Sequence, residues 1–192
     1  MKFLTIDQNS HTYLDFECFF KGPVKVKLSK DSEKSIIKSH NLFIKKLRSS
    51  DVIYGVNTGF GKLSDISIND RDQILLQENL VRSHASGIGK PFDLGLVRVI
   101  FYLKILTFIK GYSGIRLQVV AKIIDYLNHD ILPVIPEKGS VGASGDLAPM
   151  GHMALALIGE GEVFFNGKRS KTSDVLIQLK IKPLKLQPKE GL

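Results

Sequence analysis

Apolar side chains recur at the 3.6-residue spacing of an amphipathic helix over four long stretches of this chain. They predict helices at residues 31–47, 70–82, 93–110 and 115–128. Asp31 and Asn69 stand where a side chain can cap the first two helices, and Gly111 follows the third, where helices often end. The stretch 93–110 is apolar on nearly every face, which is typical of a buried helix or of one that meets a partner surface.

Shorter patterns complete the prediction. KVKL and VIYGV (residues 52–56) alternate or cluster apolar residues as short strands do. ILPVIP must be extended, because proline restricts the residue before it. EVFFNGKR predicts a hairpin that turns at Asn166-Gly167. LAPMGHMALALIG reads as a helix with Pro149 in its first turn, and a short helix is expected at 173–179. The predicted fold class is mainly α with a few short strands.

Three glycine-rich loops interrupt these helices, at residues 55–61, 84–89 and 139–145, which is more flexible backbone than connectors need. The second and third each contain Ala-Ser-Gly, as residues 85–87 and 143–145. Small residues beside glycine usually form only a turn.

Ala-Ser-Gly also permits one unusual reaction. A tight bend brings the Gly145 amide nitrogen onto the Ala143 carbonyl carbon, and glycine tolerates such a bend. Ring closure with loss of water, followed by loss of a second water from Ser144, leaves an exocyclic methylidene. This group is a strong electrophile, which ordinary side chains do not supply. Both copies meet the minimal requirement, so the tripeptide alone does not choose between a turn and a ring.

Composition narrows the function classes. The chain has 192 residues, 43% of them hydrophobic and 24% charged, as in a soluble globular protein. The net charge of +8 is spread without interleaved aromatic residues or a nucleic-acid motif, so we expect no nucleic-acid partner. We also expect no membrane association, because the longest apolar stretch carries Arg98 and Lys104 and is shorter than the ~20 residues of a span. A single cysteine, Cys18, and no secretory signal favour a reducing, cytoplasmic location.

The residues around the second Ala-Ser-Gly carry a resemblance to a known family. GSVGASGDLAPMGHMALALIGEGE closely resembles the signature of the histidine and aromatic amino acid ammonia-lyases, in which this tripeptide becomes a methylidene-imidazolone. VIYGVNTGFGKL, LQENLVRSHASGIG, KGYSGIR and PKEGL continue the resemblance in order. It covers roughly residues 50 to 192 and is weak before residue 50, so 1–49 is the least family-like part of an N-terminal region spanning 1–192.

The resemblance implies roles for particular residues. Ala143, Ser144 and Gly145 would form the prosthetic group without an external cofactor or a metal. Tyr54 matches the family's general base, which acts once its surroundings favour the phenolate. Ser83-His84 lies where the family selects the substrate ring, and an imidazole there can hydrogen-bond another imidazole or a phenol. The flanking loop carries predicted lid and hydrogen-bonding residues: Gly55, Asn57, Thr58, Gly59 and Gly61.

The implied activity is elimination of ammonia from L-histidine, leaving trans-urocanate. A tyrosine or phenylalanine ammonia-lyase or aminomutase remains open, because some tyrosine enzymes also carry Ser-His. Family chains are longer, with a bundle of long helices absent here, and they form homotetramers. We therefore expect a truncated portion of the family's fumarase/aspartase-like helical architecture, and a non-catalytic fragment or folding module stays as an alternative.

Arg116 is either a bidentate carboxylate ligand or an ordinary surface arginine.

Overall fold

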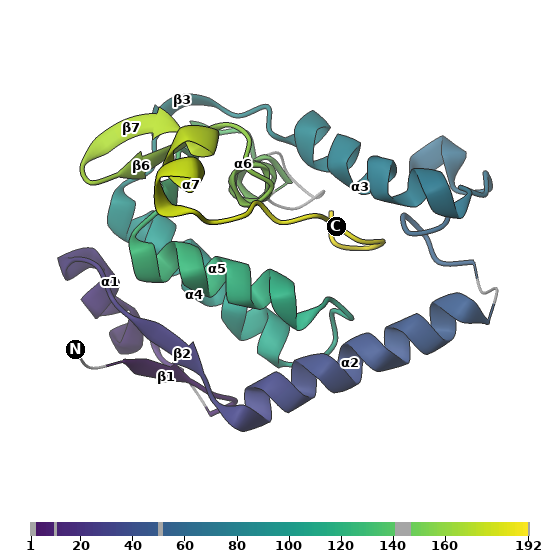
Figure 1. Cartoon of the computed structure of the whole chain (residues 1–192), viewed down its shortest axis with the longest axis horizontal. Helices are drawn as coiled ribbons and strands as arrows, with labels where there is room; N and C mark the ends of the chain where they lie inside the picture. The colour runs from purple at the N-terminus through teal and green to yellow at the C-terminus, as the bar shows by residue number, and fades with distance from the viewer. Residues whose placement is uncertain (1–2, 10, 50–51, 141–146, 192) are drawn as a thin grey trace.

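The computed structural model describes residues 3–9, 11–49, 52–140 and 147–191 (Figure 1). Helices dominate this part of the chain, as predicted. Their bounds are α1 Glu17–Lys21, α2 Lys30–Arg48, α3 Asp70–His84, α4 Leu94–Ile109, α5 Leu117–His129, α6 Leu147–Leu157 and α7 Thr172–Leu179, with short 3-10 helices at Tyr13–Phe16 and Gly61–Leu63. The strands are β1 Leu4–Ile6, β2 Val26–Leu28, β3 Ile88–Pro91, β4 Leu132–Pro133, β5 Pro136–Lys138, β6 Glu162–Phe165 and β7 Lys168–Lys171.

Helix α4 lies at the centre of the core. Its side chains at Val97, Phe101, Ile105 and Ile109 are almost fully buried, and α1, α2 and α5 all pack against it. The nearly continuous apolar sequence of this helix therefore reflects burial on several sides at once. Leu103 is the exception, with 43% of its surface exposed.

The strands form three small sheets. β1 pairs with β2 in parallel, β3 pairs with β5 antiparallel, and β4, β6 and β7 form an antiparallel sheet in that order. The predicted hairpin is confirmed. Asn166 and Gly167 both have positive φ, 50° and 73°. Positive φ at both residues is what a two-residue hairpin turn needs if it is to match the twist of its strands.

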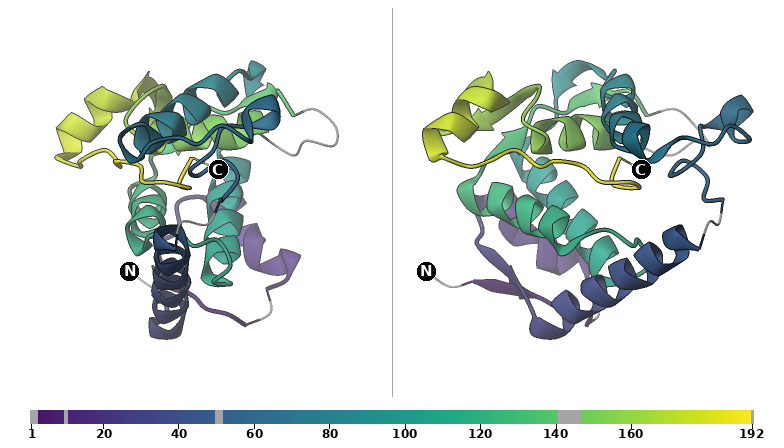
Figure 2. Two further views of the ribbon diagram at one scale, coloured as in Figure 1. Left: turned by 90° about the vertical axis from the view of Figure 1, so that its right-hand side faces the viewer. Right: turned by 45° about the vertical axis from the view of Figure 1, so that its right-hand side comes forward.

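Helices α3 and α6 form a second layer over α4 and α5 (Figure 2). They approach closely because Gly151 of α6 lies against the end of α3, where a Cβ would meet the His84 carbonyl carbon at 2.8 Å. The C-terminal segment runs between the layers, since Gly191 bonds to α3 and Glu190 to the start of α5.

Three local predictions were wrong. Ser29, rather than Asp31, caps α2, and its side chain accepts a hydrogen bond from the Ser32 amide. His84 ends α3 instead of opening a loop, because the Ala85 amide still bonds to the Val81 carbonyl. The stretch 52–56 forms turns and no strand, because its amides bond to residues three or four positions away in the chain and no strand lies beside it among the described residues.

Candidate active site

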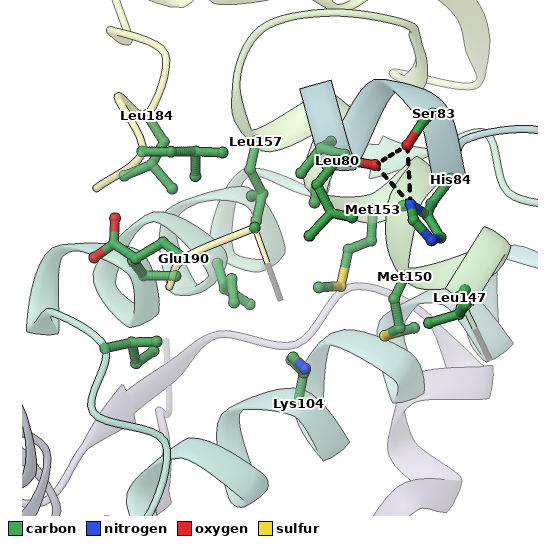
Figure 3. Close-up of a pocket in the computed structure, with 18 of the residues that line it drawn as sticks. Leu80, Ser83, His84, Lys104, Leu147, Met150, Met153, Leu157, Leu184 and Glu190 are labelled. Carbon is green, nitrogen blue, oxygen red and sulfur yellow. Dashed lines mark hydrogen bonds between the residues drawn. The ribbon is translucent and has the colours of Figure 1, made fainter. Parts of the chain in front are cut away.

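A cavity of about 810 Å³ lies between the two layers (Figure 3). Its walls are mostly apolar and come from α3, α4, α5, α6 and the C-terminal segment. A large apolar cavity with a few polar groups is the usual form of a small-molecule site. The lining residues that carry polar chemistry are Tyr54, Ser83, His84, Lys104 and Glu190. The cavity thus brings together Tyr54, which the sequence predicts as the base, and Ser83 and His84, which it predicts as the substrate-selecting pair.

The imidazole of His84 is held in one tautomer. Its Nδ1 lies 2.8 Å from the Leu80 carbonyl oxygen, which can only accept, so Nδ1 carries the proton. The Ser83 hydroxyl donates to the same carbonyl at 2.9 Å and lies 3.1 Å from Nδ1. In the neutral ring Nε2 is then an acceptor, and no described residue bonds to it. His84 can therefore accept a hydrogen bond from a donor in the cavity.

Tyr54 stands on the turn that precedes α3. Its side chain is 57% exposed, packs edge-on to the Phe60 ring at 5.6 Å, and accepts a hydrogen bond from the Gly61 amide at 3.1 Å. The phenol oxygen thus has a backbone amide donor directed at it, and the hydroxyl remains able to donate in its turn.

The loop after Tyr54 is tightly packed. The Thr58 hydroxyl accepts from the Gly55 amide at 3.1 Å, and the Asn57 side-chain oxygen accepts from the Ile53 amide at 2.8 Å. At Gly59 a Cβ would lie 2.6 Å from that of Leu63, so only glycine fits. Gly55 and Gly61 have positive φ, 69° and 55°. The glycines thus allow a compact turn, and their predicted lid motion stays a prediction.

Arg116 is a carboxylate ligand, and the carboxylate belongs to this chain. Its Nε and Nη2 atoms bond to the two oxygens of Glu190 at 2.7 and 2.6 Å. The Glu190 side chain is only 1% exposed, and it also accepts from the Gln187 amide at 2.8 Å. This pair fixes the C-terminal segment along one wall of the cavity. No local sequence pattern pairs Glu190 with Arg116, because 74 residues separate them.

Lys104 was also missed as a cavity residue. Its Nζ points from α4 into the cavity (Figure 3) and lies 4.9 Å from the centroid of the Phe108 ring. Burial lowers the pKa of this amine from its ordinary value. Within the described residues no carboxylate pairs with it.

Ala143, Ser144 and Gly145 lie outside the described residues, but their flanks are placed. A Cβ on Gly139 would lie 2.7 Å from the Cβ of Ala148 and 3.0 Å from the Cα of Gly87. The chain before the tripeptide and the helix after it are therefore in contact, and α6 begins at Leu147 in the cavity wall. The other Ala-Ser-Gly copy, 85–87, connects α3 to β3, and its Gly87 amide donates to His152 Nε2 at 3.0 Å.

No group of three or more histidine, cysteine or acidic side chains is arranged as a metal site in the part of the chain that the structure describes. The described helices also include none that is both long and apolar enough to cross a membrane.

Comparison with known proteins shows the family of this chain. The model of the aromatic amino acid lyase family matches residues 12–192, and the chain belongs to that family. The match includes most of the segment 1–49, where the sequence itself had given only a weak resemblance.

Curated and solved relatives are similar over nearly the whole chain. A histidine ammonia-lyase of Staphylococcus aureus is 41% identical over 98% of this chain, which spans 38% of that relative. The structure of a histidine ammonia-lyase from Trypanosoma cruzi is 31% identical with a TM-score of 0.89, over 100% of this chain and 37% of the other. Tyrosine aminomutase from Streptomyces globisporus is 35% identical with a TM-score of 0.89, over 98% and 35%. The chain thus spans between 35% and 38% of the length of these relatives.

Proposed function

We propose that this chain is the N-terminal, prosthetic-group-bearing region, residues 1–192, of an enzyme that eliminates ammonia from L-histidine to give trans-urocanate. The observation that carries the proposal is that Tyr54, Ser83 and His84 line one and the same cavity, in whose wall α6 begins at Leu147, two residues after Gly145 in the sequence. The 41% identity to a histidine ammonia-lyase supports the choice of substrate.

Each residue has a task that its geometry permits. His84 offers Nε2 as an acceptor, which suits an imidazole N–H of the substrate. Tyr54, with the Gly61 amide at its oxygen, takes the proton from the substrate β-carbon. The apolar side chains of α6, such as Met150 and Met153, exclude water from the ring.

Ala143, Ser144 and Gly145 would supply the methylidene-imidazolone, an electrophile that activates the substrate for loss of ammonia. The described flanks fit this group, because Gly139 and Ala148 lie in contact on either side of the tripeptide and bring it to the start of α6 in the cavity wall. No metal and no external cofactor enter this proposal.

A tyrosine or phenylalanine lyase or aminomutase is the second candidate. The likeness to tyrosine aminomutase favours it, and the Nε2 acceptor of His84 would suit a phenol hydroxyl as well.

We further propose a cytoplasmic homo-oligomer, a tetramer as in the family, with a small amino acid substrate and with neither nucleic acid nor membrane as partner.

Two measurements on the full-length gene product test these proposals. The intact mass should be lower than the sequence mass by two water molecules, and an undiminished mass would favour the non-catalytic module. Turnover should be faster with histidine than with tyrosine or phenylalanine. Replacing His84 with leucine should lower kcat/KM for histidine by about 10- to 200-fold more than for phenylalanine, with the substitution of His129, which is exposed and outside the cavity lining, as the control. Equal native activity on histidine and tyrosine would overturn the substrate assignment.

A further inference from the structure

One buried side chain connects the turn that bears Tyr54 to the C-terminal segment. Gln77 of α3 is 0% exposed. Its Nε2 donates to the Gly55 carbonyl oxygen at 3.0 Å, and its Oε1 accepts from the Gly191 amide at 2.9 Å. A single amide thus bonds to two backbone segments that are distant in sequence, 22 and 114 residues from it.

Both segments are shaped to receive this amide. At Gly191 a Cβ would lie 2.5 Å from the Gln77 carbonyl oxygen, so any other residue would move the segment away from α3. Gly55 has both of its peptide groups bonded, its amide to Thr58 and its carbonyl to Gln77. Both peptide groups that flank Gly55 are therefore held, each through one polar atom.

The far end of the connection is also anchored. Glu190 precedes Gly191 and is held by Arg116 at the N-terminal cap of α5. A continuous series of bonds therefore runs from α5 through Glu190 and Gln77 to the turn at Tyr54. Tyr54 is 57% exposed, and the two contacts given above for its ring, with Phe60 and the Gly61 amide, come from the loop that follows the same turn. The position of the ring in the cavity therefore depends on how the backbone of this turn is held.

We propose that Gln77 is a positioning residue for Tyr54, and that it couples the placement of this base to the placement of the C-terminal segment. The inference rests on the proposed function, in which Tyr54 removes a proton. Gln77 itself does not line the cavity. Its effect should therefore fall on the proton-transfer step and less on substrate binding.

Substitutions of Gln77 in the full-length gene product test this. Gln77→Leu should lower kcat by about 100-fold, as misplacement of a catalytic group by about 1 Å can do, with a smaller change in KM. Gln77→Glu keeps an acceptor for Gly191 but loses the donor to Gly55 until the carboxyl is protonated. Its kcat relative to native enzyme at the same pH should therefore rise as the pH falls.

Gln73 provides the matched control. It is a glutamine one turn earlier on α3, 5% exposed, whose Nε2 donates to the Ile68 carbonyl at 3.2 Å. Gln73→Leu should lower stability without lowering kcat to the level of Gln77→Leu. Equal losses of kcat in the two variants would overturn the positioning role, because they would reflect general damage to α3.

A readout without turnover separates this inference from the proposed activity. Fluorotyrosine at position 54 should give a ¹⁹F resonance that shifts or broadens in Gln77→Leu and stays in place in Gln73→Leu. Amide exchange should quicken at both Gly55 and Gly191 in Gln77→Leu. An unchanged resonance would overturn the positioning of Tyr54 whether or not the enzyme is active. A shifted resonance in a protein without lyase activity would overturn the proposed function and support the positioning.

Discussion

Gly151 of α6 packs directly on the backbone of His84 at the end of α3. A Cβ at position 151 would lie 2.8 Å from the His84 carbonyl carbon and 2.9 Å from the Ala85 nitrogen. Neither backbone atom can swing away as a flexible side chain would. The distance between α3 and α6 therefore depends on the absence of a Cβ at Gly151, and so does the depth of His84 in the cavity.

Replacing Gly151 with alanine should destabilise the protein. Helix propensity alone predicts the opposite, a gain of about 1 kcal/mol for Gly→Ala in a helix interior. The clash should reverse the sign and cost about 1–3 kcal/mol. Urea unfolding of both proteins measures the difference. An increase in the free energy of unfolding would mean that α3 and α6 do not pack this closely.

Tyr54→Phe should remove activity and leave the fold intact. The hydroxyl bonds only to the exposed Gly61 amide among the described residues, so the free energy of unfolding should change by less than about 0.5 kcal/mol. Loss of a general base should lower kcat by about 10²- to 10⁴-fold. Tyr112→Phe is the control, since Tyr112 is 91% exposed and outside the cavity lining. Full activity of Tyr54→Phe would exclude Tyr54 as the base.

Arg116 and Glu190 should be strongly coupled in stability. Arg116→Leu leaves the Glu190 carboxylate, 1% exposed, without its cation, which should cost about 3 kcal/mol. In a Glu190→Gln background the same substitution should cost less, because no buried charge is left. A double-mutant cycle by chemical denaturation should give a coupling of about 0.5–3 kcal/mol. Additive effects would contradict a buried pair.

His152 should make stability depend on pH. Burial lowers the pKa of this imidazole below its ordinary value of 6.5, and its Nε2 accepts from the Gly87 amide only when unprotonated. The unfolded chain therefore binds the proton more readily, and stability falls as the pH drops from about 6.5 toward the lowered folded pKa. His152→Gln retains an acceptor but does not titrate.

The test of His152 is the difference between native protein and His152→Gln, which cancels all other titrating groups. The native free energy of unfolding should fall more steeply than that of the variant as the pH is lowered through this window. Parallel pH profiles would show that His152 is not held in its neutral form.

The sequence by itself determined the helices, the hairpin and the family. These features depend on residues close together in the chain, such as the apolar face of α5, the cap at Asn69 and the Asn166-Gly167 turn. Local sequence also located Tyr54 and the Ser83-His84 pair by their motifs. It misjudged the stretch around Tyr54, whose apolar residues resemble a strand, because a strand needs a neighbour that only the fold provides.

Only the tertiary structure decided which of these residues meet. Arg116 binds the carboxylate of Glu190, which lies 74 residues away in the sequence. Gln77 bonds to both Gly55 and Gly191, and Gly191 lies 114 residues from it. No local pattern encodes such pairs, because a buried ion or amide is satisfied by whatever the packing brings to it. The motifs therefore name the candidate residues Tyr54, Ser83 and His84, and the packing of distant segments brings these three to one cavity.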